Sequence, residues 1–229
     1  MNSTDMKDSA VKHLVLKDWR LNRMQIFLSM AAGVLALGVI QRGGETAFVV
    51  GGVWFFMSLI LVGHMLPLVG ILNERKKQNL AFLMSLPVSF LQYTTAKLLS
   101  TLGMFLIPWL TLVSAGLWLI ESRGILPRGA IPMALILAFM PFVGFSLITG
   151  AVLVSESEGW GIAVNVACSS SYALVWYFLG KIPGLMSNAM APSPVWNSAA
   201  RNVLECEFGL VVAILGLTFY LQSKKKDFV

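Results

Sequence analysis

Six long apolar segments constrain what this chain of 229 residues can fold into. A helix needs about 20 mostly apolar residues to cross the hydrocarbon core of a bilayer. The candidate segments are Met24–Ile40, Phe48–Leu72, Leu98–Ile120, Ile131–Val154, Trp160–Leu179 and Phe208–Leu221. Only 12% of the residues are charged and 57% are hydrophobic, whereas a soluble domain carries roughly a quarter charged residues. The sequence therefore predicts an all-α, polytopic membrane protein with six transmembrane helices.

The last segment is short because Glu207 and Lys224 bracket it closely. It can still cross a bilayer if Lys224 and Lys225 extend their ammonium groups back to the interface. An even number of spans places both ends of the chain on the same side of the membrane.

The lysines and arginines predict which side that is, because cytoplasmic loops carry an excess of them. One side would carry Lys7, Lys12, Lys17, Arg20, Arg23, Arg75, Lys76, Lys77, Lys97, Lys224, Lys225 and Lys226. The other side would carry only Arg42, Arg123, Arg128, Lys181 and Arg201. We therefore expect both termini in the cytoplasm. The net charge of +6 then reflects membrane orientation and predicts no nucleic-acid partner.

These assignments divide the chain into a leader, a membrane domain and a tail. Residues 1–23 form a cytoplasmic amphipathic leader, 24–221 the six-helix domain and 222–229 a basic cytoplasmic tail. Within the membrane domain, 73–97 is a cytoplasmic loop and 180–207 an external loop. No separate soluble domain is expected.

The predicted spans contain few ionisable side chains that could bind an ion or catalyse a reaction. All carboxylates fall outside them or at their edges, and His64 is the single side chain well inside a span that titrates near neutrality. Proton-coupled carriers rely on such groups, so a secondary transporter is not favoured, although Na⁺ sites built from backbone carbonyls stay open. The sequence has no GxxxxGK[ST] phosphate-binding loop. The chain is therefore expected to lack its own energy source.

An integral-membrane enzyme that pairs His64 with a serine or cysteine is an alternative. Ser146 is one candidate, but its surroundings Gly144-Phe145-Ser146-Leu147 lack the second glycine of a nucleophile elbow. A lone histidine in an apolar helix is more often a hydrogen-bonded packing residue. A non-transporting membrane assembly or immunity factor is a third possibility. We expect a protein that is not itself an enzyme and that binds no metal.

The loop between the second and third spans is the most informative stretch. A charged block opens it, apolar residues follow at roughly helical spacing, and Pro87 ends that helix because it removes a backbone donor. Ser89 can cap a second short helix. The pattern predicts a helix parallel to the membrane, able to receive force from a cytosolic partner. Alternatively, the loop only reconnects two spans and its basic residues fix the topology.

The string Glu74-Arg75, Leu80, Leu83, Ser85-Leu86-Pro87-Val88-Ser89, followed by Lys97, resembles the signature of ABC-2-type transporter permeases. The leader segment Leu16-Lys17-Asp18-Trp19-Arg20-Leu21-Asn22-Arg23 is similar to the basic amphipathic segment before their first span. The chain departs from the family pattern at Gln78, where a glycine is usual, and at Ala81, where an acidic residue is usual.

This resemblance implies a permease that pairs with a second permease, identical or homologous, and with two copies of a cytosolic ABC ATPase. ATP and Mg²⁺ would bind those ATPase subunits and not this chain. The implied ATPase-coupling residues are Glu74, Arg75, Lys76, Lys77, Leu80, Leu83 and Pro87. The implied connecting helix carries Val11, Leu14, Val15, Trp19 and Arg20, and it would lie against membrane lipid.

The fifth span carries small residues at every fourth position, which lets helices approach closely. These residues are Gly159, Ala163, Ala167 and Ser171. Their neighbour is either another span of this chain, which we favour, or the second permease. Asn165 and Ser169 to Ser171 make this the most polar span, so it either lines a substrate route or bonds to neighbouring helices.

Two further expectations concern bends and the external side. Pro67, Pro108 and Pro141 should bend or locally open three spans. By resemblance, the external loop would contain a short re-entrant helical element that caps the pathway. The function implied is a multi-pass permease of the bacterial cytoplasmic membrane that exports an amphipathic, peptide or lipid-like substrate.

Overall fold

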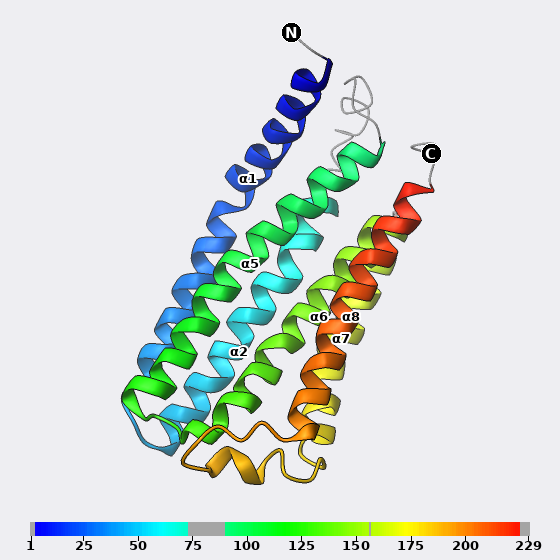
Figure 1. The fold of residues 1–229 in the computed structure, drawn as a ribbon. Helices are drawn as coiled ribbons and strands as arrows, with labels where there is room; N and C mark the ends of the chain where they lie inside the picture. Colours follow the sequence, from blue (N-terminus) through cyan, green and yellow to red (C-terminus); the bar gives the residue numbers. More distant parts are fainter. Residues whose placement is uncertain (1–2, 73–89, 156, 225–229) are drawn as a thin grey trace.

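The fold is a bundle of six long helices, seen in a computed structural model that describes residues 3–72, 90–155 and 157–224 (Figure 1). The long helices are α1 (Ser3–Ile40), α2 (Glu45–Pro67), α5 (Phe90–Arg123), α6 (Ile131–Ser155), α7 (Glu158–Leu179) and α8 (Ser198–Ser223). The short ones are η1 (Leu68–Leu72), η2 (Arg128–Ala130) and η3 (Ser187–Met190). All six long helices are long and apolar enough to span a membrane, and the described residues contain no strand. The all-α, six-span prediction is confirmed at this level.

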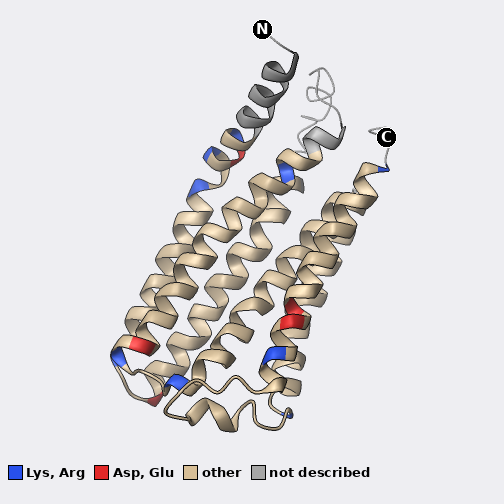
Figure 2. Cartoon of the chain, viewed as in Figure 1, with Lys and Arg blue, Asp and Glu red and all other residues tan. Residues whose placement is uncertain are grey.

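Both ends of the chain lie at the same end of the bundle, which we call the terminal end; the opposite end is the far end (Figure 1). Charged residues gather towards these two ends of the ribbon, and few lie between them (Figure 2). Many of the large side chains exposed along the helices are apolar, and they include Phe27, Trp118 and Phe208. A surface of this kind is suited to contact with lipid chains.

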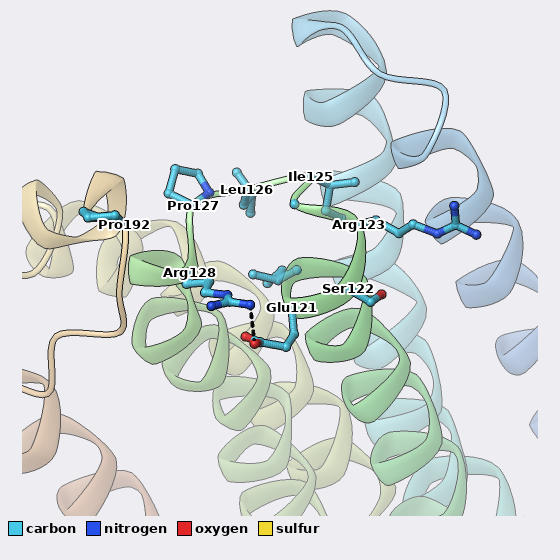
Figure 3. Close-up of a pocket in the computed structure, with 10 residues that line it drawn as sticks. Glu121, Ser122, Arg123, Ile125, Leu126, Pro127, Arg128 and Pro192 are labelled. Atoms are coloured by element: carbon cyan, nitrogen blue, oxygen red, sulfur yellow. Dashed lines mark ion pairs between the residues drawn. The ribbon is translucent and has the colours of Figure 1, made fainter.

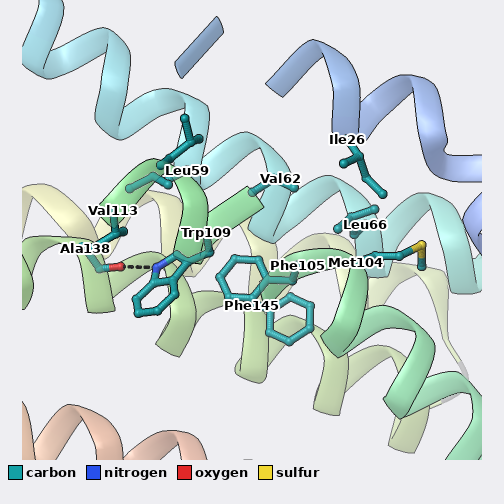
Figure 4. Close-up of a cluster of buried hydrophobic side chains, with 11 residues drawn as sticks. Ile26, Leu59, Val62, Leu66, Met104, Phe105, Trp109, Val113, Ala138 and Phe145 are labelled. Atoms are coloured by element: carbon teal, nitrogen blue, oxygen red, sulfur yellow. Dashed lines mark hydrogen bonds between the residues drawn. The ribbon is translucent and has the colours of Figure 1, made fainter. Parts of the chain in front are cut away.

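Helix α6 lies at the centre of the bundle, since it packs against α2, α5, α7 and α8, while α1 packs against α2 and α5. The main core joins α1, α2, α5 and α6 (Figure 4). At its middle, the rings of Phe105 and Phe145 stack with centroids 4.4 Å apart. The indole of Trp109 donates a hydrogen bond of 2.7 Å to the carbonyl oxygen of Ala138. This core fixes α5 against α6.

Three helices are longer than their apolar segments predict. Helix α5 begins at Phe90, so residues 90–97 of the predicted cytoplasmic loop belong to this helix. Helix α1 continues without a break from the leader into the first span. Helix α8 begins at Ser198 rather than near Phe208, because the side chain of Asn197 accepts a hydrogen bond of 2.8 Å from the backbone of Ala200 and caps it. Arg201, Glu205 and Glu207, which hydropathy assigns to the external loop, therefore lie in this helix.

The three prolines act differently from one another. At Pro67 the α-helix gives way to the π-helical turn η1, which ends where the described residues stop. Pro108 and Pro141 lie inside α5 and α6 without ending either helix. A change of helix type is therefore seen directly after Pro67, where the described residues lead into the loop between α2 and α5.

The far end is closed by loops. Gly43 and Gly44 have φ values of 77° and 88°, which favour glycine, and they reverse the chain between α1 and α2. The segment between α7 and α8 runs across this end and carries η3 (Figure 1). It is fastened to η2, where the backbone N–H of Gly129 donates to the carbonyl of Ala191 at 3.0 Å.

Candidate functional site

The residues that the family resemblance assigns to ATPase coupling lie outside the described residues. They are Glu74, Arg75, Lys76, Lys77, Leu80, Leu83 and Pro87. Of the connecting-helix residues, Val11 and Leu14 belong to α1, but only its backbone is described there. Val15 and Trp19 are half-buried and Arg20 is exposed. Trp19 packs against the main core, so this part of the leader joins the bundle.

A buried ion pair joins α1 to α5 near the terminal end. Both carboxylate oxygens of Asp18 accept from Nζ of Lys97, at 3.0 and 2.9 Å. The two side chains are only 6% and 4% exposed. Neighbouring polar groups use backbone carbonyls: Asn22 donates to the carbonyl of Asp18, and Thr101 donates to that of Lys97. The sequence analysis placed Asp18 and Lys97 separately, in the leader and in the loop, and did not pair them.

A second ion pair, at the far end, is of a different kind. Arg128 Nη2 lies 2.8 Å from Glu121 Oε1, and both side chains are 54% exposed. It borders an open hollow between the end of α5, η2 and Pro192 (Figure 3). Exposed pairs of this type contribute little to stability.

A polar cluster lies within the bundle, where α2 and α7 both meet α6. His64 of α2 is 3% exposed, and its Nε2 lies 2.7 Å from Oη of Tyr172 on α7. The other ring nitrogen, Nδ1, lies 3.4 Å from Oγ of Ser169, also on α7. The cluster needs Gly144 of α6, because a Cβ there would collide with the hydroxyl of Tyr172 and approach His64 Nε2 to 2.9 Å.

His64 has three polar partners on α7, since the side chain of Asn165 also hydrogen-bonds to it. Two tautomers fit this geometry: in one the phenol of Tyr172 donates to Nε2 and Nδ1 carries the proton, and in the other Nε2–H donates to Tyr172. In either tautomer the cluster ties α2 to α7 by hydrogen bonds inside the bundle.

The serine that the sequence analysis considered is elsewhere. Ser146 is fully buried and donates to the carbonyl of Phe142 in its own helix, so it is a packing residue. Sequence position alone could not bring Ser169 to His64, because they are 105 residues apart. No group of three or more His, Cys, Asp or Glu side chains that could hold a metal lies within the described parts of the chain.

The small-residue stripe of α7 does not face the rest of the chain. Gly159, Ala163 and Ala167 are exposed and Ser171 is half-buried. The buried side of the helix carries Gly161, Cys168 and Tyr172 instead. In a single copy of the chain, most of this stripe is therefore exposed on the surface of the bundle.

The fold is that of a six-helix, multi-pass membrane protein with a buried ion pair near its terminal end and a polar cluster inside. Comparisons of the chain with family models, with curated proteins and with solved structures found no match. The proposals below therefore depend on the residues themselves.

Proposed function

We propose that this chain is the transmembrane subunit of an ATP-driven exporter of the ABC-2 type in a bacterial cytoplasmic membrane. The six spans, the absence of a phosphate-binding loop in the sequence and the resemblance of residues 74–89 support this proposal. The motor would be a pair of cytosolic ATPase subunits that bind ATP and Mg²⁺. The excess of basic residues in the leader, in residues 73–97 and in the tail of the sequence supports a cytoplasmic position for the terminal end.

The observation that carries the proposal is the pair Asp18–Lys97. It lies where α5 leaves the predicted coupling loop, and it ties α5 to α1 by a buried charge contact. On the other side of the loop, α2 ends in the π-helical turn after Pro67. Such turns often occur at functional sites. A push on the loop would therefore move α1 and α5 together, whereas η1 gives α2 a place to yield.

In the proposed cycle, ATP binding closes the two ATPase subunits and moves residues 73–89. A second permease completes the pathway, and a cleft between the two opens outward to release an amphipathic, peptide or lipid-like substrate. The open small-residue stripe of α7 (Gly159, Ala163, Ala167 and Ser171) supports an interface with that second permease.

Site-directed cross-linking tests the proposal. In a chain with Cys168 and Cys206 replaced by serine, a single cysteine is introduced by Leu83→Cys in the predicted coupling loop. A bifunctional thiol-and-amine reagent should join this position to a nucleotide-binding polypeptide in native membranes. The matched control is Met190→Cys, an exposed position of η3 at the far end, which should give no such product.

A second test measures coupling in the intact complex. Glu74→Arg or Leu83→Asp should leave membrane insertion intact while uncoupling ATP hydrolysis from transport. Equal cross-linking of Leu83→Cys and Met190→Cys, or unchanged export by both loop variants, would contradict the proposed role of the loop.

A further inference from the structure

Glu207 is a carboxylate inside α8, on the side of this helix that packs against α6. It lies nine residues after Ser198, which is about 14 Å along the helix at 1.5 Å per residue. The residues of α8 that are buried or half-buried against the bundle recur every three or four positions, and Glu207 belongs to this series. The series is Ala200, Leu204, Glu207, Val211, Ile214, Thr218 and Gln222. Its side chain is therefore directed into the contact between α8 and α6, the helix that α8 packs against most closely.

One oxygen of this carboxylate is enclosed without a partner. Oε2 of Glu207 is buried and has no hydrogen-bond partner among the described residues. Helix α6 supplies no counter-charge, because it carries no ionisable side chain along its whole length. The residue as a whole is only half-buried, which leaves an approach for a proton from outside the bundle.

The ionisable groups of α5, which also packs on α8, lie near the two ends of α5. They are Tyr93, Lys97, Glu121 and Arg123. Lys97 is bonded to Asp18, and Glu121 is paired with Arg128. The opposite charges of α5 are therefore committed to other partners or lie at its far end.

The remaining ionisable groups near α8 also leave Glu207 without a counter-charge. Tyr172 of α7 shares a hydrophobic cluster with Leu204 and is hydrogen-bonded to His64. Lys181, in the segment between α7 and α8, lies over the ring of Tyr177, 5.1 Å from its centroid. On α8 itself, Arg201, Glu205, Cys206 and Tyr220 are exposed. No ion pair within the described ranges involves Glu207.

A carboxylate that stays ionised in such a place loses its hydration and gains neither a counter-charge nor a donor, whereas a bound proton removes the charge. We propose that Glu207 is a proton-binding site and that its proton holds α8 against α6. With the proton bound, the contact between the two helices is neutral. Without it, the charged carboxylate is more stable in water than in the contact, so α8 loosens from α6.

This inference does not depend on the proposed function, because it needs neither an ATPase nor a second permease. The full chain in phosphatidylcholine nanodiscs is studied by infrared spectroscopy, which detects the carbonyl stretch of a protonated carboxylic acid. The unmodified chain should show this band at neutral pH, and Glu207→Gln should remove it. The matched control is Glu205→Gln, at an exposed carboxylate on the same helix, and it should keep the band.

Hydrogen–deuterium exchange tests the consequence for α8. At a pH high enough to abolish the band, backbone exchange in α8 should be faster in the unmodified chain and in Glu205→Gln than in Glu207→Gln, whose amide is neutral at every pH. No acid band in the unmodified chain, or a band that Glu207→Gln retains, would overturn the proposal. Equal exchange in all three chains would overturn it too. So would a Glu207→Gln chain that fails to fold, because a neutral amide of the same shape should replace a protonated acid.

Discussion

The buried pair Asp18–Lys97 gives the sharpest prediction for stability. Lys97→Met keeps the length and apolar volume of the side chain but removes its charge, which leaves the carboxylate of Asp18 among buried atoms. Both carboxylate oxygens accept from the ammonium group, and the pair is nearly inaccessible to solvent. Removing one partner of such a pair costs about 3–5 kcal/mol, because the remaining buried charge loses this counter-charge.

That cost can be converted to a melting temperature. For a chain of this size, 1 kcal/mol lowers the Tm by about 2–4 °C, so Lys97→Met should lower it by roughly 6–20 °C. The exposed pair Glu121–Arg128 is the internal control. Arg128→Gln should cost about 0–1 kcal/mol, or at most about 4 °C. The double variant Asp18→Asn with Lys97→Met, which removes both charges, should be more stable than Lys97→Met alone.

The assay is thermal unfolding of the full chain in one detergent at one scan rate, followed by the near-ultraviolet signal of its tryptophans. Equal Tm losses for Lys97→Met and Arg128→Gln would refute the argument from burial. A double variant no more stable than Lys97→Met would refute the argument that the loss comes from the buried carboxylate of Asp18 without the ammonium group of Lys97.

Three further substitutions test the packing. Gly144→Ala should separate His64 from Tyr172 and cost about 1–3 kcal/mol, since its Cβ would collide with the phenol oxygen; the same thermal assay measures this. Gly129→Ala should cost about as much and should expose the far-end loop to limited proteolysis, because its Cβ would meet backbone atoms there. Trp109→Phe removes the indole donor to a buried carbonyl and should cost about 1–3 kcal/mol by the same assay.

Matched controls exist for the glycine substitutions. A Cβ at Gly38 in α1 or at Gly209 in α8 would meet nothing within 4 Å. Gly38→Ala and Gly209→Ala should therefore leave the Tm unchanged or raise it slightly, because alanine favours a helix over glycine. Losses at these two positions equal to the loss at Gly144 would show that backbone effects, and not the collision, explain the result.

The six helices could be predicted from the sequence because a run of apolar residues is a local property. The boundaries of the helices were harder to predict from the sequence. The start of α8 at Ser198 depends on the Asn197 cap, which competes with the hydropathy signal of Arg201 and Glu205. The π-helical turn after Pro67 was not predicted either. A proline indicates that a helix is disturbed, but the type of turn depends on the partners that the freed backbone carbonyl groups find.

The candidate sites were less predictable because they depend on contacts between distant residues. Asp18 and Lys97 are 79 residues apart, and His64 and Tyr172 are 108 residues apart. The sequence signals available were the opposite charges of Asp18 and Lys97 and the polarity of His64 and Tyr172 within apolar segments. Neither signal identifies the partner residue until the packing of the helices is known. The coupling residues at 74–87 stay a prediction from the resemblance of their sequence.

The central claim is that a separate ATPase drives this bundle from its terminal end. Native mass spectrometry of the complex, released from its own membrane in mild detergent, tests that claim most directly. The account predicts an assembly of two permease chains, at least one of them this 25.0 kDa chain, with two nucleotide-binding subunits. A known ABC-2 complex treated in parallel should keep its ATPase. The intact chain released without any nucleotide-binding subunit, while that control complex survives, would contradict the account.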